Sequence, residues 1–523
     1  MFYLTTAIDY TNGAPHIGHA YEKVWADVIA RYHRLRGDEV YFLTGVDQHG
    51  QKVEQTARRE GVLPADFALR NTGLFLALWR KLGLSNDGWA ATTDDRHKRC
   101  VQAILTDLHA KGQLYKKAYC GHYSVRQEQF LSDKDRDASG NFGPEWGEVV
   151  ELKEENWYFR LSDHAQWLRD YFSGRDDAVI PAFRKAEVLN AIDRAADTDL
   201  CISRPKERLA WGIELPFDPD FVTYVWFDAL INYISFAGYL NSDPAAGLPD
   251  FERLWPCDAH VIGKDILVPA HSIYWHAMLH AMGFEDARMP RLLVHGWWNI
   301  KGEKMSKSLG NIVDPDQLAD TFGADALRYY LVRDISVGRD ADFDLGRLVM
   351  LHNTELANNL GNLCNRALNM SKRYRDGVLS PAGGHDDDEC RTLRAAFDTC
   401  LAGYRTAMDG FEVDSALHAL RVYLDVCNGF AERTKPWELA KDPGQAPRLD
   451  AVLSHMVETV AHAAVLLSPV LPVAAGKIRD QLRAPFLADL TLAELKWGLL
   501  PAGHQTAKPD PVFPRLELPA DDA

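Results

Sequence analysis

The sequence predicts an α/β protein: a parallel-sheet domain that is split by a β-rich insertion and followed by an α-helical bundle. Three observations carry this prediction. The N-terminus reads as a strand, a helix and a second strand; strand-like segments return after residue 217; and beyond Leu345 only amphipathic helical patterns remain. With 523 residues, 46% of them hydrophobic, the chain can bury the cores of about three to four domains.

The opening segment predicts a β-α-β unit. We expect a strand over 2–8, a turn over 12–15 and a second strand over 40–44. Gly37 is a plausible stop for the intervening helix. Such a unit feeds a parallel sheet, whose ligand sites lie beyond the strand C-termini. The helix is indicated by apolar residues at three- and four-residue steps: Tyr21, Val24, Trp25, Val28, Ile29, Tyr32 and Leu35.

Residues 115–216 have a different pattern, with short aromatic and charged stretches and a Gly-rich loop over 137–141. These features are typical of β structure, and they predict an inserted domain. The α/β pattern then resumes at strand-like segments over 224–226, 259–262 and 292–294. The predicted domain ranges are 1–114 and 217–300 for the split domain, 115–216 for the insertion, 301–345 for a connecting segment, 346–500 for the bundle and 501–523 for an irregular tail.

Charge and cysteine usage limit the class of protein. The net charge of −16 argues at first sight against nucleic acid, although the basic run at 372–375 leaves a local basic face possible. The eight cysteines form no C-x-x-C pair, which favours reduced core thiols. The stretch over 461–475 contains Pro469 and Pro472 and is shorter than the ~20 residues of a membrane span. With no leader segment recognised, we expect a cytoplasmic protein that does not contact a membrane.

Two short motifs carry the chemistry. His16-Ile17-Gly18-His19 follows the first strand and opens the first helix, where backbone N–H groups and the helix dipole favour phosphate. Lys304-Met305-Ser306-Lys307-Ser308 follows the last strand-like segment, between Gly302 and Gly310. Either motif alone is modest evidence: a tetrapeptide with two histidines occurs by chance in many proteins, and the lysine motif alone favours a solvated basic loop.

Together the two motifs resemble the signature sequences of class I aminoacyl-tRNA synthetases, and nearly the whole chain resembles the methionyl-tRNA synthetase family. The resemblance implies a Rossmann-type catalytic domain and an anticodon-binding helical bundle. It also implies ATP with Mg²⁺ as cosubstrate, and methionine and tRNA(Met) as substrates. In the family, residues matching His16 and His19 contact ATP phosphates and the glycine matching Gly18 lets adenine lie close. Lys304 and Lys307 would close over the pyrophosphate, a step that depends on charge stabilisation.

The resemblance extends residue by residue to the amino-acid pocket. Asp47 matches the aspartate that holds the α-ammonium group, although a turn aspartate is common at such a position. Whether His271 is a pocket histidine depends on where a gap is placed, because the segment after Gly263 is one residue longer than in some relatives. The alternative is a helix histidine with its hydrogen bonds satisfied elsewhere. Gly263 and Asp265 match nucleotide-binding positions. The other pocket positions are Ala7, Ile8, Tyr10, Trp226, Ala229, Leu230, Tyr233 and Ile266.

The insertion departs from the family pattern. Many members carry paired cysteines there that bind a structural zinc, whereas this chain has Ser124-Val125-Arg126-Gln127 and Gly143-Pro144-Glu145-Trp146. Because the thiolate ligands of a closed tetrahedral site are missing, we expect no structural zinc. At about 100 residues the insertion is also short for the hydrolytic domain of the larger isoleucine, valine and leucine enzymes.

In the helical region, Asn362, Arg366 and Trp437 resemble the family's anticodon-reading residues. Unpaired bases are read by stacking on aromatic rings and by hydrogen bonds from Asn and Arg. Some relatives carry a further C-terminal domain that promotes dimers, and without it we expect a monomer. Two alternatives stay open: a paralogue that activates a different amino acid, and a tRNA-binding protein that has lost catalysis.

Overall fold

A seven-stranded parallel sheet forms the centre of the N-terminal half. The computed structural model describes residues 1–124, 129–131, 133–137, 139–195, 198–241, 243–304, 313–380 and 386–519. The strand order is β2-β3-β1-β13-β14-β8, and β4 also pairs with β3. The strands are β1 (Phe2–Thr6), β2 (Asp9–Tyr10), β3 (Val40–Asp47), β4 (Gly88–Ala91), β8 (Val179–Ile180), β13 (Ala259–Gly263) and β14 (Leu292–His295).

Both faces of this sheet are buried. Along β1, Phe2 and Leu4 point into one hydrophobic cluster and Tyr3 points into another, as the two-residue period of a strand requires. Near-continuous hydrophobic strands of this kind are typical of parallel sheets with helices on both sides. The covering helices are α1 (Ile17–Arg36) and α3 (Pro64–Leu82) on one side, and α4 (Asp95–Ala110), α7 (Val225–Ser235), η6 (Leu267–Trp275) and α10 (His276–Met282) on the other.

The predicted first helix is confirmed as α1. The residues expected on its apolar face are buried, except that Leu35 near the C-terminal end is only partly buried. Gly37 ends the helix in a left-handed conformation with φ of 95°. A residue without Cβ adopts this conformation at little cost, which explains the stop.

The strands differ from the prediction in their bounds. The first strand ends at Thr6 and a separate short β2 follows, whereas β3 continues as far as Asp47. The segment over 224–226 is not a strand, because helix α7 begins at Val225. The preceding β12 (Asp218–Thr223) is the strand of that region.

The insertion contains two antiparallel sheets, which bears out its expected β character. The pairing of β5 with β7 runs over eleven residue pairs, from Leu114↔Phe159 to Ser124↔Val149. Helices α5 (Ala165–Gly174) and α6 (Lys185–Ala195) were not anticipated, and β8 returns from this region to the central sheet. The remaining insertion strands are β5 (Leu114–Ser124), β6 (Gln129–Leu131), β7 (Val149–Phe159), β9 (Leu200–Cys201), β10 (Ser203–Pro205) and β11 (Glu214–Leu215).

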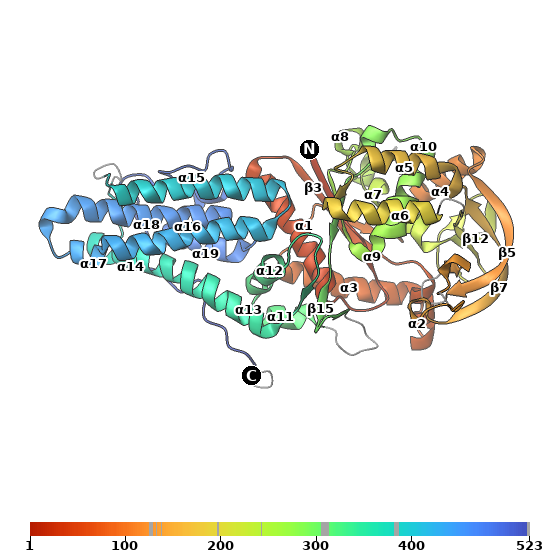
Figure 1. Ribbon diagram of the computed structural model, residues 1–523, viewed down its shortest axis with the longest axis horizontal. Coiled ribbons are helices and arrows are strands. Elements are labelled where there is room, and N and C mark those ends of the chain that lie inside the picture. Colours follow the sequence, from red (N-terminus) through yellow and green to blue (C-terminus); the bar gives the residue numbers. More distant parts are fainter. Residues whose placement is uncertain are drawn as a thin grey trace.

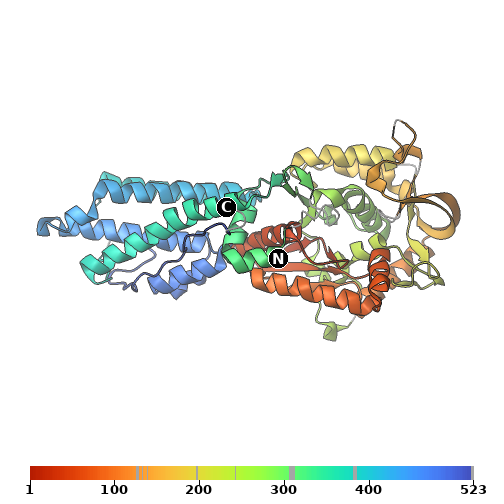
Figure 2. The ribbon, with the colours of Figure 1, turned by 90° about the horizontal axis from the view of Figure 1, so that it is seen from below.

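The C-terminal half is helical. Figures 1 and 2 show an elongated molecule with this bundle at one end and the insertion at the other. Among the described residues, the helical segment Pro443–Leu466, which contains α18, has the length and apolar character of a membrane span, and 94% of its most apolar window is buried inside the protein. The helices are α13 (Leu345–Leu351), η9 (His352–Gly361), α14 (Asn362–Arg375), α15 (Asp388–Asp409), α16 (Val413–Thr434), α17 (Pro436–Leu439), α18 (Ala446–Leu466) and α19 (Pro472–Leu482).

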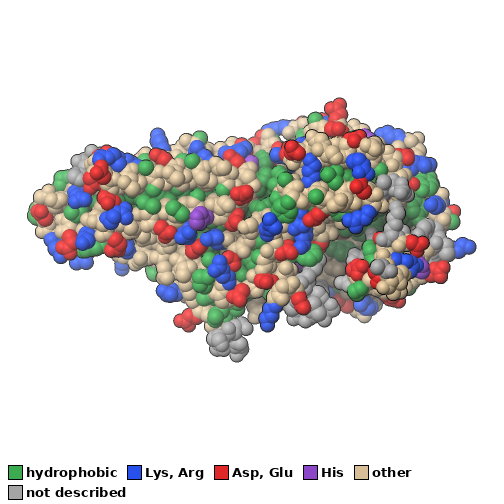
Figure 3. Space-filling view, viewed as in Figure 1, with side chains coloured by type: hydrophobic (Ala, Val, Ile, Leu, Met, Phe, Trp, Pro, Cys, Tyr) green, Lys and Arg blue, Asp and Glu red, His purple; other side chains and the backbone are tan. Residues whose placement is uncertain are grey.

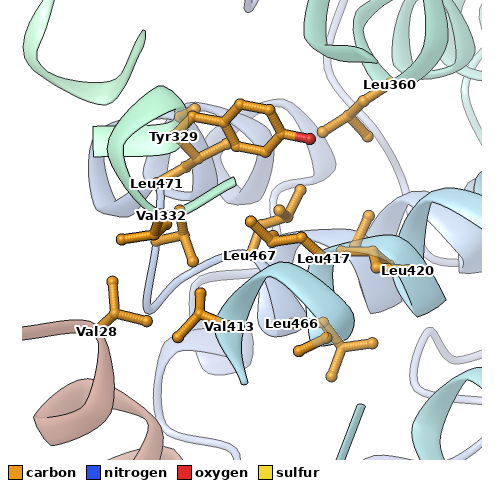
Figure 4. Packing of buried hydrophobic residues seen from close by; sticks show 14 of the residues in the cluster. Val28, Tyr329, Val332, Leu360, Val413, Leu417, Leu420, Leu466, Leu467 and Leu471 are labelled. Atoms are coloured by element: carbon orange, nitrogen blue, oxygen red, sulfur yellow. The ribbon is translucent and has the colours of Figure 1, made fainter. Parts of the chain in front are cut away.

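The two halves share one hydrophobic core. In Figure 4, Val28 of α1 and Val332 of α12 (Ala324–Arg333) lie close to Val413 of α16, and all belong to one cluster of buried residues. The fully buried Arg328 pairs with Asp27 at 2.7 Å and donates hydrogen bonds to backbone carbonyls at Leu82, Pro469 and Val470. The sheet is therefore joined firmly to the bundle.

Candidate functional site

The C-terminal ends of the central strands gather the predicted site residues. The chain passes from β1 to β3 on one side and later returns through β13 on the other side. This reversal of strand order is where open parallel sheets bind their ligands. Ala7 follows β1 directly, Asp47 ends β3 and Gly263 ends β13, whereas His16 caps α1, the helix between β2 and β3.

The two motif histidines cap helix α1. His16 is the N-cap: its Nδ1 accepts a hydrogen bond from the Gly18 backbone at 3.1 Å, while Nδ1 of His19 accepts from the His16 backbone at 3.1 Å. Because both Nδ1 atoms accept, the proton of each neutral ring is on Nε2, a donor suited to phosphate oxygens. A Cβ on Gly18 would lie 2.9 Å from Cε1 of His16, so a side chain there would disturb the pair.

The lysine motif begins at Lys304, and the first described residue after it is Val313. Lys304 belongs to β16 (Glu303–Lys304), which pairs with β15 (Trp298–Ile300). The Lys304 side chain and all of Lys307 lie outside the described residues. On the far side of the loop, the Val313 carbonyl accepts a hydrogen bond from the Ile17 backbone at 3.2 Å. Val313 is thus tied to the first turn of α1.

Aromatic side chains surround the expected amino-acid pocket. Tyr233 donates its hydroxyl hydrogen bond to Nε2 of His271 over 3.0 Å, and Nδ1 of His271 donates to the Ile266 carbonyl over 2.8 Å. The Trp226 and His271 rings meet edge to face, with centroids 6.1 Å apart. On α7, Trp226, Ala229, Leu230 and Tyr233 follow at helical spacing, which places them along one side.

His271 joins this cluster through an unusual helix. η6 is a π-helix, a form that accommodates an additional residue within a helical turn. Within this helix His271 lies close enough to Tyr233 for the hydrogen bond between them. Burial lowers the pKa of His271 to about 4, so the ring is neutral at physiological pH.

Asp47 is fixed at the end of β3. Its Oδ1 accepts hydrogen bonds from the Thr92 hydroxyl and the His49 backbone, each at 3.3 Å. Its backbone carbonyl accepts from both the backbone and the hydroxyl group of Thr11 at 3.0 Å. In the β2–β3 pairing Asp47 lies opposite Tyr10. The carboxylate is buried and held, as a binding site for an ammonium group requires.

A buried network behind Asp47 was missed in the sequence. Asp228 accepts hydrogen bonds from His49 Nδ1 at 2.7 Å and from His97 Nε2 at 2.9 Å, and the other nitrogen of His97 contacts the Ser235 hydroxyl at 2.8 Å. Burial opposes ionisation of Asp228, but His49 and His97 outweigh it and lower the pKa of the carboxyl. The position of Asp228 between two pocket residues was a usable signal, whereas nothing in the sequence indicated His97.

The Gly263–Asp265 segment forms the rim of the site. A Cβ on Gly263 would lie 2.7 Å from Oδ1 of Asp265. Trp297 donates its indole hydrogen bond to the same oxygen at 3.2 Å, and Lys264 lies over the Trp297 ring at 4.0 Å. Trp297 and Lys264 were also missed by the sequence analysis.

The predicted anticodon residues lie together in the bundle. The Arg366 guanidinium is 5.9 Å from the centroid of the Trp437 ring and forms an ion pair with Glu432 at 2.6 Å. Asn362 lies one turn before Arg366 on α14 and is exposed. On the face shown in Figure 3, acidic and basic side chains are intermixed over the bundle rather than separated.

Two cavities lie outside the predicted pocket. One of about 690 Å³ lies between the insertion and η6, and its walls include Cys201, Arg204, Tyr224 and Tyr274 but none of the predicted site residues. A cleft of about 410 Å³ lies between η9 and α16. Among the described residues no group of three or more His, Cys, Asp or Glu side chains is placed to hold a metal ion.

Comparison with known proteins gives a consistent result. Residues 2–140 and 146–368 match the family described as class I tRNA synthetases (M), and residues 380–521 match the anticodon binding domain of methionyl tRNA ligase. The methionine–tRNA ligase of Rhizobium meliloti is 40% identical and covers 99% of this chain and 98% of the relative. The corresponding ligase of Fusobacterium nucleatum is 37% identical, over 100% of this chain and 81% of the relative.

Solved structures agree with the sequence relatives. The Mycobacterium tuberculosis methionyl-tRNA synthetase bound by methionyl-adenylate is 37% identical to this chain. It superposes with a TM-score of 0.90, over 98% of this chain and 100% of that one. The apo form from the same organism gives a TM-score of 0.85 at 35% identity, over 99% of this chain and 98% of that one.

Proposed function

This chain belongs to the methionyl-tRNA synthetase family, and from this premise we infer that it activates methionine with ATP and transfers the methionyl group to tRNA(Met). The observation that carries the inference is that the histidine pair and the aromatic cluster both lie at the C-terminal ends of the central strands. The His16 and His19 pair opens α1 beside β1, and the aromatic cluster of Tyr233 and His271 lies beyond β13. A phosphate-binding helix end and an apolar pocket are thereby brought together.

The first reaction joins the methionine carboxylate to the α-phosphorus of ATP and releases pyrophosphate. His16 and His19 bind phosphate oxygens through their Nε2–H groups, and the dipole of α1 adds favourable charge. Lys304 and Lys307 supply further positive charge as pyrophosphate leaves. Gly18, Gly263 and Asp265 contact the nucleoside. Mg²⁺ accompanies the ATP phosphates, as is usual for this hard cation.

The methionine itself binds between Asp47 and the aromatic cluster. The Asp47 carboxylate pairs with the α-ammonium group beside Tyr10. The thioether lies against Trp226, Tyr233 and the neutral His271, because sulfur packs favourably at ring edges. Ala7, Ile8, Ala229, Leu230 and Ile266 complete the pocket.

The second reaction transfers the methionyl group to the 3′-terminal ribose of tRNA, and AMP leaves. At the other end of the molecule, Arg366 and Trp437 read unpaired anticodon bases together with Asn362. The proposal further includes a monomer of 58.8 kDa, an insertion without zinc and a cytoplasmic location.

Charging of tRNA tests this proposal. We expect purified protein to attach labelled methionine to tRNA(Met), and we expect Trp437→Ala to weaken tRNA use by about 10-fold or more, since one stacked base contributes ~1–3 kcal/mol. Methionine-dependent ATP–pyrophosphate exchange should stay unchanged in this variant. A protein that exchanges pyrophosphate but charges no tRNA would contradict the second half-reaction.

A further inference from the structure

Four titratable side chains are buried together beneath the methionine pocket, and we call them the Lys23 network: Asp9, Glu22, Lys23 and His295. Lys23 has no exposed side-chain surface, and the other three residues are all buried. They come from three segments: the Ile8–Tyr10 part of the pocket, helix α1, and the end of β14. The mechanism described above uses none of them.

Lys23 has one acceptor for each of its three N–H groups. Its Nζ lies 2.7 Å from the Ala7 carbonyl, 2.9 Å from Asp9 Oδ1 and 2.6 Å from Glu22 Oε1. The backbone N–H of Ala7 in turn donates to the Val261 carbonyl of β13 at 2.9 Å. The Ala7 peptide groups are therefore held by a sheet strand on one side and by a side chain of α1 on the other.

Glu22 extends the network to the nucleotide side. Its second oxygen contacts His295 Nε2 at 3.0 Å, while Nδ1 of His295 contacts the Gly296 carbonyl at 2.7 Å. Burial opposes ionisation of Glu22, but Lys23 and His295 outweigh it and lower the pKa of the carboxyl. His295 also lies next to Gly263, since a Cβ on that glycine would be 3.5 Å from its ring.

The network therefore connects parts that must keep a fixed relative position. Glu22 and Lys23 follow His19 by three and four residues on the same helix, so their side chains lie on the same face as His19. A cation on that helix that binds the Ala7 carbonyl fixes the distance between the pocket segment and the phosphate-binding histidines. In the first reaction this distance decides whether the methionine carboxylate meets the α-phosphorus.

A purely structural role is the competing explanation. Buried ion pairs often contribute little net stability, because desolvation offsets their attraction. The same helix provides a matched comparison: Asp27, four residues beyond Lys23, is equally buried. It pairs with Arg31 on the same helix and with Arg328, which bonds to the bundle rather than to the methionine pocket. The two groups share burial and charge and differ in which part of the molecule they hold.

We propose that Lys23 is a positioning residue for methionine, which holds the Ala7–Tyr10 segment in register with the histidine pair of α1. The proposal rests on the proposed activation of methionine. Its distinguishing feature is an effect on methionine that is larger than the effect on ATP, because the histidines themselves stay on an intact helix.

Steady-state pyrophosphate exchange with Lys23→Met tests the proposal. We expect KM for methionine to rise by about 10-fold to 100-fold, the effect of losing a charged hydrogen bond, and KM for ATP to change less than about 2-fold. Asp27→Asn is the control, which should lower the melting temperature and leave both KM values unchanged. Lys23→Met with Asp9→Asn removes both partners of the buried Lys23–Asp9 pair, and it should recover part of the melting temperature while KM for methionine stays high.

Three results would overturn the proposal: an unchanged KM for methionine in Lys23→Met, an equal rise in Asp27→Asn, or recovery of KM in the double variant. If Lys23→Met does not fold, the double variant decides alone. Failure of the proposed function is distinguishable, because the unaltered protein would then show no exchange with methionine.

Discussion

At the scale of single residues, hydrogen bonds decide which form each site histidine takes. His16 and His19 accept at Nδ1, whereas His271 donates at Nδ1 and accepts at Nε2. The first two are thereby prepared to donate to an anion, and the third presents a neutral ring to an apolar side chain. One residue type serves two purposes because its neighbours differ.

The Asp228 network gives the first prediction. Asp228→Asn weakens the hydrogen bonds to His49 and His97, and we expect it to lower the free energy of unfolding by about 2 kcal/mol, measured by urea denaturation at pH 7. A rise in KM for methionine should accompany the loss, because His49 lies two residues from Asp47. A variant as stable as the unaltered protein would show that the network does not fix this segment.

The same carboxyl predicts a pH dependence. The pKa of Asp228 is lowered on folding from the ~3.9 of an unfolded aspartate. Its contribution to stability is therefore fully present above about pH 4 and is lost as the pH falls through the folded-state value. Below pH 4 we expect the melting temperature of the unaltered protein to fall more steeply than that of Asp228→Asn. Parallel curves for the two proteins would contradict this assignment.

At the scale of the elements, secondary structure was predicted best where the hydrophobic pattern extended over many residues. The apolar period of α1 and its stop at Gly37 were both recognisable, because the face of a 20-residue helix repeats several times. The predicted strand over 224–226 was wrong. Tyr, Val and Trp favour strands in isolation, but tertiary packing makes Val225 the start of α7. β8 has two residues and no pattern to recognise, so its return to the sheet was unforeseeable.

In the candidate site, some residues could be predicted from the sequence and others could not. Strand ends and the motif at His16 could be located from local sequence. In the structure, Asp47 lies at the C-terminal end of β3, and Tyr233 and His271 are hydrogen-bonded to each other. The supporting charges could not be found, because Lys23 and His295 meet only through the fold. Their positions in sequence look like ordinary helix and strand-end residues.

The end of α1 supplies an element-level prediction. Gly37 has φ of 95°, which a residue with a Cβ adopts only under strain. We expect Gly37→Ala to lower the free energy of unfolding by about 1 kcal/mol, measured by thermal or chemical denaturation, with KM values for methionine and ATP unchanged. A measurable rise in either KM would show that the helix end is coupled to the site.

At the scale of the whole molecule, one core joins the synthetase half to the bundle. Arg328 is central to it, because its guanidinium contacts Asp27 of α1 and the Pro469–Val470 turn between α18 and α19. This joint fixes the bundle, which carries the proposed anticodon residues, relative to the central sheet, which carries the proposed reaction centre, as a tRNA that contacts both would require.

The contacts that Arg328 makes between the two halves lead to a prediction for the removal of its guanidinium. Arg328→Met leaves Asp27 buried without its main partner, and such losses cost about 3–5 kcal/mol. We expect a lower melting temperature in calorimetry and separate transitions for the two halves, while pyrophosphate exchange at 20 °C persists. A single transition at the original temperature would show that apolar packing alone joins the halves.

The most direct test of the central claim is ATP–pyrophosphate exchange by the purified protein, measured with each of the twenty amino acids and repeated with Lys307→Ala. We predict that methionine alone supports rapid exchange and that the substitution slows it strongly. Exchange driven by a different amino acid would contradict the assignment of the pocket, and no exchange with any amino acid would contradict the assignment of a catalytic site.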